Sequence, residues 1–285
     1  MKTSRSALPA ALFFFAFLPL PSRAQQAPLP DPSALLLKVK ANQHRIEELR
    51  HNYICKESDD IDELDKDGAV KKHETAEYDF YWQGRVQVRR LTSKNGKPLS
   101  PDELRKEDEK LDKAKKKAEE KLEKREAEGN ESANIGIDTF LRASIFQNER
   151  RELYQGHPVI AMSVVPNPQF KPNTMAERIV HLLEGTVWID EEAAQIVRLE
   201  AHLGKSYKMA GGLAFNIREG SGARLEQQHI NGEVWMPSLA DINVQGRALL
   251  FAGIHQHIIQ HFTNYQKFRA DTKILAIDPA PSEAK

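Results

Sequence analysis

Cysteine is almost absent from this 285-residue chain, in which Cys55 is the only one. A lone thiol excludes an internal disulfide framework and a zinc site built from several thiolates, because both need more than one cysteine. Cys55 lies between a helical pattern and a strand pattern, so we expect it to be buried as a small hydrophobic side chain. The alternative is a reactive thiol.

Long apolar runs are equally scarce. Downstream of residue 24, no run approaches the roughly 18 residues that a membrane-spanning helix needs. The one strongly apolar stretch, residues 7–20, follows two basic residues and is itself too short to span a bilayer. Ser22-Arg23-Ala24 then places small residues at the positions that a signal peptidase reads. The sequence therefore predicts a signal peptide over residues 1–24, cleaved after Ala24, and a periplasmic or secreted mature protein; a non-cleaved anchor is the alternative.

An excess of charge of either sign is missing too, since the chain has 41 basic and 41 acidic residues. Removing residues 1–24 takes away three basic residues and no acidic one, which leaves 38 against 41 and a formal charge of −3. The sequence also has no Lys/Arg stripe interleaved with aromatic residues. These two features exclude a nucleic-acid-binding protein.

The sequence also lacks the common catalytic motifs. The sequence has no Gly-x-Ser-x-Gly nucleophile turn, no His-Glu-x-x-His helix and no phosphate-binding loop, so we predict no enzyme, no catalytic residue and no cofactor. The nearest approach to a metal site is His255, His257 and His261, which share one face if they lie on a strand. Because Ile254, Ile258 and Phe262 alternate with them and are expected to point inward, we expect the histidines to face solvent. No carboxylate lies near them in the sequence. A metal-dependent hydrolase using His255 and His257 is the alternative, and it would need ligands from other strands.

Much of the chain shows strand patterns punctuated by turn signals. Apolar and aromatic residues alternate with polar ones in many short runs, as expected for strands that bury one face. Asparagine–glycine or aspartate–glycine pairs, which suit two-residue hairpins, recur between these runs at Asp67-Gly68, Asn95-Gly96 and Asn231-Gly232. The sequence therefore predicts an antiparallel meander.

One helix is predicted near the start of the mature chain. Residues 25–32 form a proline-rich leader, and a helix is predicted over residues 33–50. Either Asp31 or Ser33 can cap the start of this helix. The apolar residues of this segment follow an approximate helical period. We expect this helix to pack one face against the sheet.

A second helix is predicted over residues 101–128, where Ser100 and Glu103 form a capping box. The segment holds eleven acidic and ten basic side chains and very few apolar ones. Leu104 and Leu111 start a heptad that later residues do not continue. We therefore expect a solvated helix inserted between two strands; the alternative is a coiled-coil docking arm for a partner.

Three short stretches of the predicted strands share a familiar layout. Residues 185–190 (Gly-Thr-Val-Trp-Ile-Asp) are followed by a second strand pattern at 196–200, segment 231–237 ends in Trp-Met-Pro, and residues 265–268 form the closing strand. Together they resemble the outer-membrane lipoprotein carrier and sorting (LolA-like) superfamily of Gram-negative envelopes.

This resemblance implies an α+β fold, namely a curved antiparallel β-sheet that forms an incomplete barrel with covering helices and an apolar cavity beneath them. The long charged helix is not part of the family pattern, and no functional residue of the family maps onto this sequence. We expect a single domain over residues 33–277 with helix 101–128 inserted, followed by a loose tail over residues 278–285.

The ligand class implied by the resemblance is a lipid or an acylated protein held in the concave face. Candidate lining residues are two sets that each share a strand face: Tyr78, Phe80 and Trp82, and Leu213, Phe215 and Ile217. The alternative is that the same side chains form the core between sheet and helix.

The predicted function is a periplasmic, non-catalytic protein that binds a lipid or an acylated ligand. The alternative is an envelope interaction or sensor module that docks through the charged helix and holds no small ligand. Peripheral contact with a membrane is compatible with both, and the sequence does not indicate an oligomeric state.

Overall fold

The computed structural model describes residues 28–83, 86–127, 137–209, 215–248 and 252–268. The predicted signal peptide, Leu213 and the predicted tail over residues 278–285 lie outside these ranges. Within the ranges, none of the helices combines the length and the apolarity that crossing a membrane requires.

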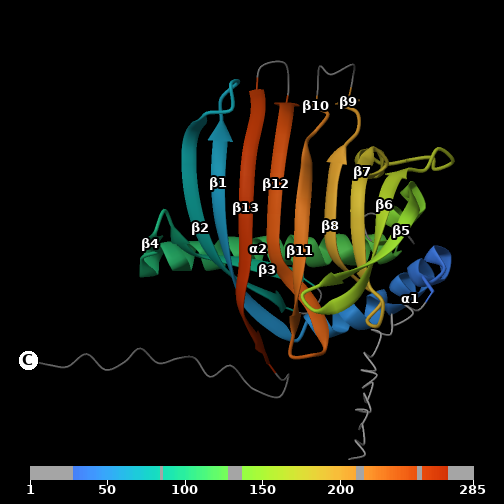
Figure 1. Cartoon of the computed structure of the whole chain (residues 1–285). Helices are drawn as coiled ribbons and strands as arrows, with labels where there is room; N and C mark the ends of the chain where they lie inside the picture. Colours follow the sequence, from blue (N-terminus) through green and yellow to red (C-terminus); the bar gives the residue numbers. More distant parts are fainter. Residues whose placement is uncertain (1–27, 84–85, 128–136, 210–214, 249–251, 269–285) are drawn as a thin grey trace, which may run out of the picture.

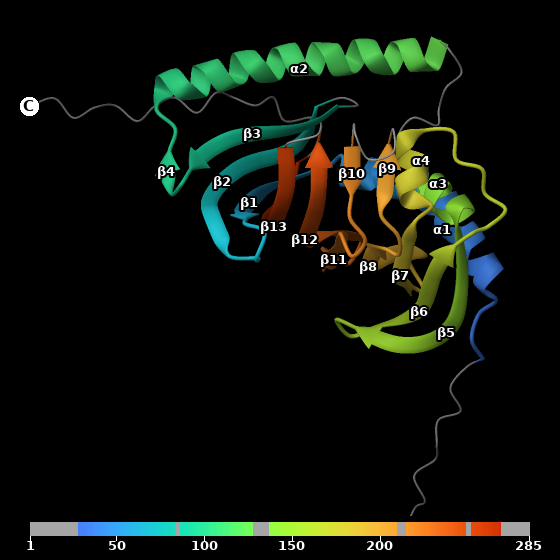
Figure 2. The ribbon, with the colours of Figure 1, turned by 90° about the horizontal axis from the view of Figure 1, so that it is seen from above.

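The strands of the described residues form one antiparallel sheet that curves without closing (Figures 1 and 2). In chain order they are β1 (Tyr53–Leu64), β2 (Val70–Gln83), β3 (Val86–Lys94), β4 (Lys97–Pro98), β5 (Ser144–Tyr154), β6 (His157–Pro166), β7 (Leu183–Asp190), β8 (Gln195–Leu203), β9 (Tyr207–Met209), β10 (Phe215–Ile217), β11 (Gly222–Ile230), β12 (Val234–Ala248) and β13 (Ala252–Lys267). Across the sheet the order is β4-β3-β2-β1-β13-β12-β11-β8-β7-β6-β5, with the short pair β9–β10 joined to β12. Because β4 and β5 are unpaired edges, the predicted incomplete barrel is confirmed.

Tight hairpin turns form at two of the three predicted dipeptides. At Asp67-Gly68 the prediction of a two-residue turn is wrong: only Gly68 has a positive φ, of 86°, and the loop between β1 and β2 is longer. Asn95 and Gly96, between β3 and β4, have φ values of 50° and 69°, and Asn231 and Gly232, between β11 and β12, have 53° and 68°. A type I′ hairpin needs this left-handed conformation at both central residues, and asparagine and glycine adopt it at the lowest cost. These dipeptides therefore fix how the flanking strands pair.

Successive side chains along each strand point alternately to the concave and the convex face of the curved sheet. Residues directly opposite each other in an antiparallel register share a face, so Cys55 lies beside Phe80, and Leu199 lies beside Val187. Cys55 is buried, as expected, in a cluster with Phe262 on the concave face.

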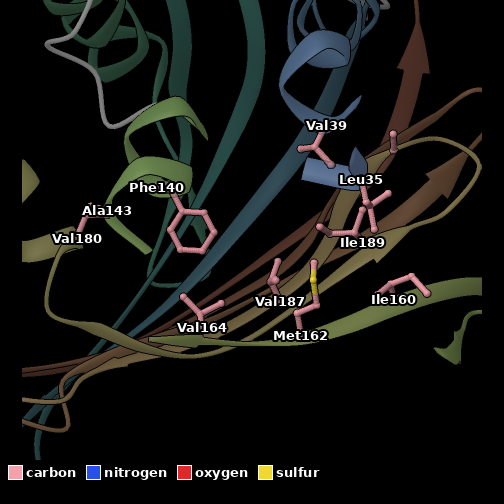
Figure 3. Packing of buried hydrophobic residues seen from close by; sticks show 11 residues of the cluster. Leu35, Val39, Phe140, Ala143, Ile160, Met162, Val164, Val180, Val187 and Ile189 are labelled. Atoms are coloured by element: carbon pink, nitrogen blue, oxygen red, sulfur yellow. The ribbon is translucent and has the colours of Figure 1, made fainter. Parts of the chain in front are cut away.

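Three helices, α1 (Pro32–Arg50), α3 (Ile137–Ala143) and α4 (Met175–Val180), cover the concave face over β5 to β8. α1 begins as predicted, because the side chain of Asp31 accepts the N–H of Ala34 at 3.0 Å. Val39 of α1 and Phe140 of α3 pack over Met162 of β6 in the largest core cluster (Figure 3). The largest core cluster therefore lies between these helices and the concave face, and a second cluster that includes Val159, Trp188 and Trp235 lies on the opposite face.

The sequence pattern does not predict α3 or α4, because segments of 7 and 6 residues are too short to show a helical period. A capping box fixes the start of α4: the side chain of Thr174 accepts the Glu177 N–H, and the Glu177 side chain accepts the Thr174 N–H. Phe140 of α3 and Val180 of α4 belong to the same core cluster as residues of β6 and β7, so both helices pack over these strands.

The charged helix α2 (Pro101–Ala127) starts with the predicted capping box, in which the Ser100 N–H donates to Glu103 Oε2 at 2.8 Å. Arg90 of β3 donates two hydrogen bonds to Asp108 of α2, at 2.6 and 3.0 Å. The side chain of Arg89 points into the concave face, so its neighbour Arg90 points outward. α2 therefore lies on the outer side of β3, with most of its residues exposed to solvent (Figure 2). It leads from β4 to α3, and not directly from strand to strand.

Candidate ligand-binding groove

A groove of about 350 Å³ lies on the concave face between α1, α3 and the sheet. This size is near the lower end of the range of about 300–1,000 Å³ that small-molecule sites occupy. Its apolar lining comes from elements that are far apart in the sequence and includes Val39, Ile46, Ile137, Phe140, Leu199 and Leu225.

The walls of the groove follow from local structure. Val39 and Ile46 are seven residues apart on α1 and therefore lie on the same helix face. Leu199 of β8 and Leu225 of β11 are directly opposed in the sheet register. Leu225 remains 40% exposed, which leaves an apolar side chain open at the groove. An apolar ligand placed here would remove this surface from water.

One end of the groove is polar and is organised around the backbone of Trp235. Arg50, the last residue of α1, donates to the Trp235 carbonyl from Nε at 3.3 Å and from Nη2 at 3.2 Å, and also to Gln227 Oε1 at 2.9 Å. The Gln195 amide nitrogen donates to the same carbonyl at 2.6 Å, and its oxygen accepts the Trp235 N–H at 3.3 Å. Burial lowers the pKa of the Arg50 guanidinium, against the weaker opposing attraction of Tyr265. The chain therefore holds a cation at the end of an apolar groove.

The first predicted set of lining residues lies on the concave face but beside this groove. Phe80 meets Phe262 edge to face, with ring centroids 5.7 Å apart. The rings of Trp82 and His51 are in contact, with their centroids 4.2 Å apart. Trp82 also lines a second hollow of about 570 Å³ whose other walls, mostly charged or polar, come from the C-terminal half of α1 and from α2. Tyr78 lies further along β2, and the guanidinium carbon of Arg89 lies 4.3 Å from the centroid of its ring.

The second predicted set lies near the rim of the same face. Phe215 and Ile217 of β10 are opposite Ala248 and Gly246 of β12, and both side chains are half-buried. Leu213 lies outside the described residues. The structure therefore places the described members of both sets on the concave face, but the lining of the groove itself comes mainly from α1, α3, β8 and β11.

A polar cluster fills the concave face beside the groove. The carboxylates of Glu57 and Asp59 are almost fully buried, at 1% and 4% exposure. Arg89 binds Glu57 through two hydrogen bonds of 2.9 and 2.6 Å and Asp59 through one of 2.8 Å. Gln260 donates to both carboxylates, at 2.8 and 3.1 Å. Burial raises the pKa of Glu57, and the hydrogen bonds and charge of Arg89 act in the opposite direction.

The three candidate histidines lie on the convex face of β13. A ring nitrogen of His255 lies 2.8 Å from the Asp65 carbonyl, and one of His257 lies 2.8 Å from Asp241 Oδ1. His261 is exposed. Among the residues that the structure describes, no group of three or more histidine, cysteine or acidic side chains is arranged to hold a metal ion.

Sequence reasoning missed most of the groove. The apolar stripe of the first helix indicates that Val39 and Ile46 face the sheet, but nothing in the sequence indicates which strands they meet. Leu225 and Arg50 have no motif, because their roles depend on the tertiary packing of α1 against β8 and β11.

Comparison with known proteins finds matches among solved structures. No protein-family model matches the sequence, and no curated protein matches it. One solved structure that matches is a domain described as an outer membrane lipoprotein-sorting protein from Vibrio parahaemolyticus, with 9% identity, a TM-score of 0.31, and coverage of 84% of this chain and 94% of that one. Another is a LolA superfamily protein from Nitrosomonas europaea, with 10% identity, a TM-score of 0.27, and coverage of 81% and 93%.

Proposed function

We propose that this protein is an exported, non-catalytic carrier that holds the acyl chain of a lipid or an acylated protein in the concave groove. The observation that carries the proposal is the apolar groove between α1, α3 and the sheet, with Leu225 left 40% exposed within it. The signal peptide predicted over residues 1–24 supports export to the periplasm or out of the cell. The chain is held by hydrophobic burial, without a covalent step.

The energetics of such a site are sufficient for a reversible carrier. Each buried methylene contributes about 0.8 kcal/mol, so about eight methylenes contribute about 6 kcal/mol before ordering costs. A groove of about 350 Å³ suits one chain and not several. We therefore expect one acyl chain per protein molecule.

Native mass spectrometry of the exported protein, purified without detergent, tests the proposal. We expect a stoichiometric species that carries one acyl chain. Leu225→Glu should abolish this species, because it puts a charge into the apolar groove. Leu153→Glu is the matched control, since Leu153 is 75% exposed on the edge strand β5 and lies outside the groove. A lipid-free protein with a folded circular dichroism spectrum, which also binds no added acyl chain, would overturn the proposal.

A docking role for α2 is the second candidate, and the exposure of its charged side chains supports it. Reversing the charge of exposed residues on this helix, with Lys113, Lys117 and Lys121 each changed to Glu, separates the two candidates without deleting the helix. A carrier should keep its acyl ligand after these changes. A docking module should lose its partner in a pull-down from envelope extracts.

A further inference from the structure

Arg50 is an arginine whose hydrogen bonds go to neutral acceptors. Within the part of the chain that the structure describes, its partners are the Trp235 carbonyl and the side-chain oxygen of Gln227. These contacts use Nε and Nη2 and leave Nη1 available to a ligand. Glu47, one turn earlier on α1, attracts the guanidinium through space but accepts its hydrogen bond from Gln43. Arg50 therefore brings a positive charge to the groove without a bound carboxylate.

Other arginines near the sheet are paired differently. Arg89 binds the carboxylate of Glu57, and Arg90 binds that of Asp108. Arg198, which also borders the groove, forms an ion pair with Glu200. Among the described residues that line the groove, there are arginines and glutamines but no aspartate or glutamate. The electrostatic character of the groove at its polar end is therefore positive.

A cation beside apolar walls whose hydrogen bonds go only to neutral acceptors is costly, and a bound anion reduces that cost. A guanidinium matches the geometry of a carboxylate or a phosphate, to which it donates charge-assisted hydrogen bonds. Val39 and Ile46 precede Arg50 on α1, so the same helix that lines the apolar groove ends at the cation. The groove thus offers apolar walls for a chain and a cationic end for a head group.

We infer that the groove selects an anionic amphiphile, with the apolar chain along α1 and the carboxylate or phosphate head group on Arg50. This inference rests on the proposed carrier function and narrows the ligand class within it. Neutral amphiphiles such as alcohols and glycerides bind more weakly, because they give the guanidinium no charge-assisted hydrogen bond.

Binding of matched probes to the exported protein tests the inference. Dodecanoate, dodecyl phosphate and dodecanol share one chain length and differ in the head group, and each can displace the uncharged dye Nile red near neutral pH. We expect dodecanoate or dodecyl phosphate to bind about tenfold to a hundredfold more tightly than dodecanol, the range of a hydrogen bond to a charged group. The ratio between the two anions distinguishes a carboxylate from a phosphate head group.

Variants of Arg50 assign the selectivity to this residue. Arg50→Gln should lose the preference for the anions and keep its affinity for dodecanol, whereas Arg50→Lys should keep part of the preference. Arg45→Gln is the matched control, because Arg45 is exposed on the same helix and does not line the groove. If Arg50→Gln does not fold, the wild-type selectivity and the Arg50→Lys variant decide the result.

The outcomes separate this inference from the proposed function. Equal binding of dodecanol and both anions to the wild-type protein would overturn the inference and leave the carrier function intact. An anion preference that persists in Arg50→Gln would also overturn it. Failure of all three probes to displace the dye would instead count against the carrier function itself.

Discussion

Replacing Arg89 with methionine should destabilise the fold by about 3 kcal/mol at neutral pH. The substitution keeps an apolar stem of similar length but removes the guanidinium that binds Glu57 and Asp59. Both carboxylates are buried, so the variant would leave two neighbouring negative charges on the concave face without their counter-charge.

The magnitude follows from the geometry of the cluster. Removing one partner of a buried ion pair costs about 3–5 kcal/mol. The side chain of Arg89 is 41% exposed, whereas that of Glu57 is 1% exposed, so water screens one side of the pair and not the other. We therefore expect a loss at the lower end of this range. Gln260 still donates to both carboxylates in the variant and limits the loss further.

The stability lost in Arg89→Met should be larger at neutral pH than at acidic pH. Burial raises the pKa of Glu57 in the folded protein. A group with a raised folded-state pKa contributes stability that is fully present below its unfolded pKa of about 4.3 and is lost as the pH rises through the folded value. Removing Arg89 takes away the main force that opposes this rise. Arg89→Met should therefore be nearly as stable as the wild type near pH 4 and much less stable near pH 7.

Urea unfolding at the two pH values, followed by tryptophan fluorescence, measures this difference. Arg90→Met is the control: it removes an adjacent guanidinium whose partner, Asp108, is 48% exposed, so we expect less than about 1 kcal/mol. Adding Glu57→Gln to Arg89→Met should recover much of the lost stability. An equal loss at both pH values, with no recovery in the double variant, would show that Arg89 acts through packing and would refute the electrostatic reasoning.

Three further predictions concern the core and a helix start. Burial raises the pKa of the Cys55 thiol to about 11, so alkylation by iodoacetamide should be slow in the native protein and fast in urea; equal rates would contradict its burial. Phe80→Ala should lower the free energy of unfolding by about 2 kcal/mol, a fraction of the cost of removing a fully buried phenylalanine, because Phe80 packs on Phe262 while half-buried; unchanged stability with loss of acyl binding would make it a ligand wall instead. Thr174→Ala should cost about 1 kcal/mol in urea unfolding through loss of the α4 capping box, and a neutral effect would show that tertiary packing alone positions α4.

Local signals in the sequence predicted much of the fold. The turns at Asn95-Gly96 and Asn231-Gly232, the cap at Asp31 and the capping box at Ser100 all form as expected. Each depends on residues within four positions of one another, where backbone φ preference and side-chain hydrogen bonds act directly. The short helices α3 and α4 were beyond this kind of signal because they lack a full helical repeat.

The sites depend on contacts that span the chain. Gln260 and Glu57 are 203 residues apart in the sequence and 2.8 Å apart in the fold. Arg50 reaches the carbonyl of Trp235 across 185 residues. Neither pairing has a local pattern, so sequence reasoning selected the alternating aromatic residues as lining and did not find the groove.

By itself, the sequence determined the alternating strands, the hairpin turns, the first helix and the solvated charged helix, because these are set by the φ preferences and periodicity of neighbouring residues. Only the tertiary structure decided which strands lie under α1, which arginines meet a carboxylate and where an apolar groove remains. The physical reason is that curvature of the sheet brings residues from distant strands together, and burial then assigns each side chain its charge environment.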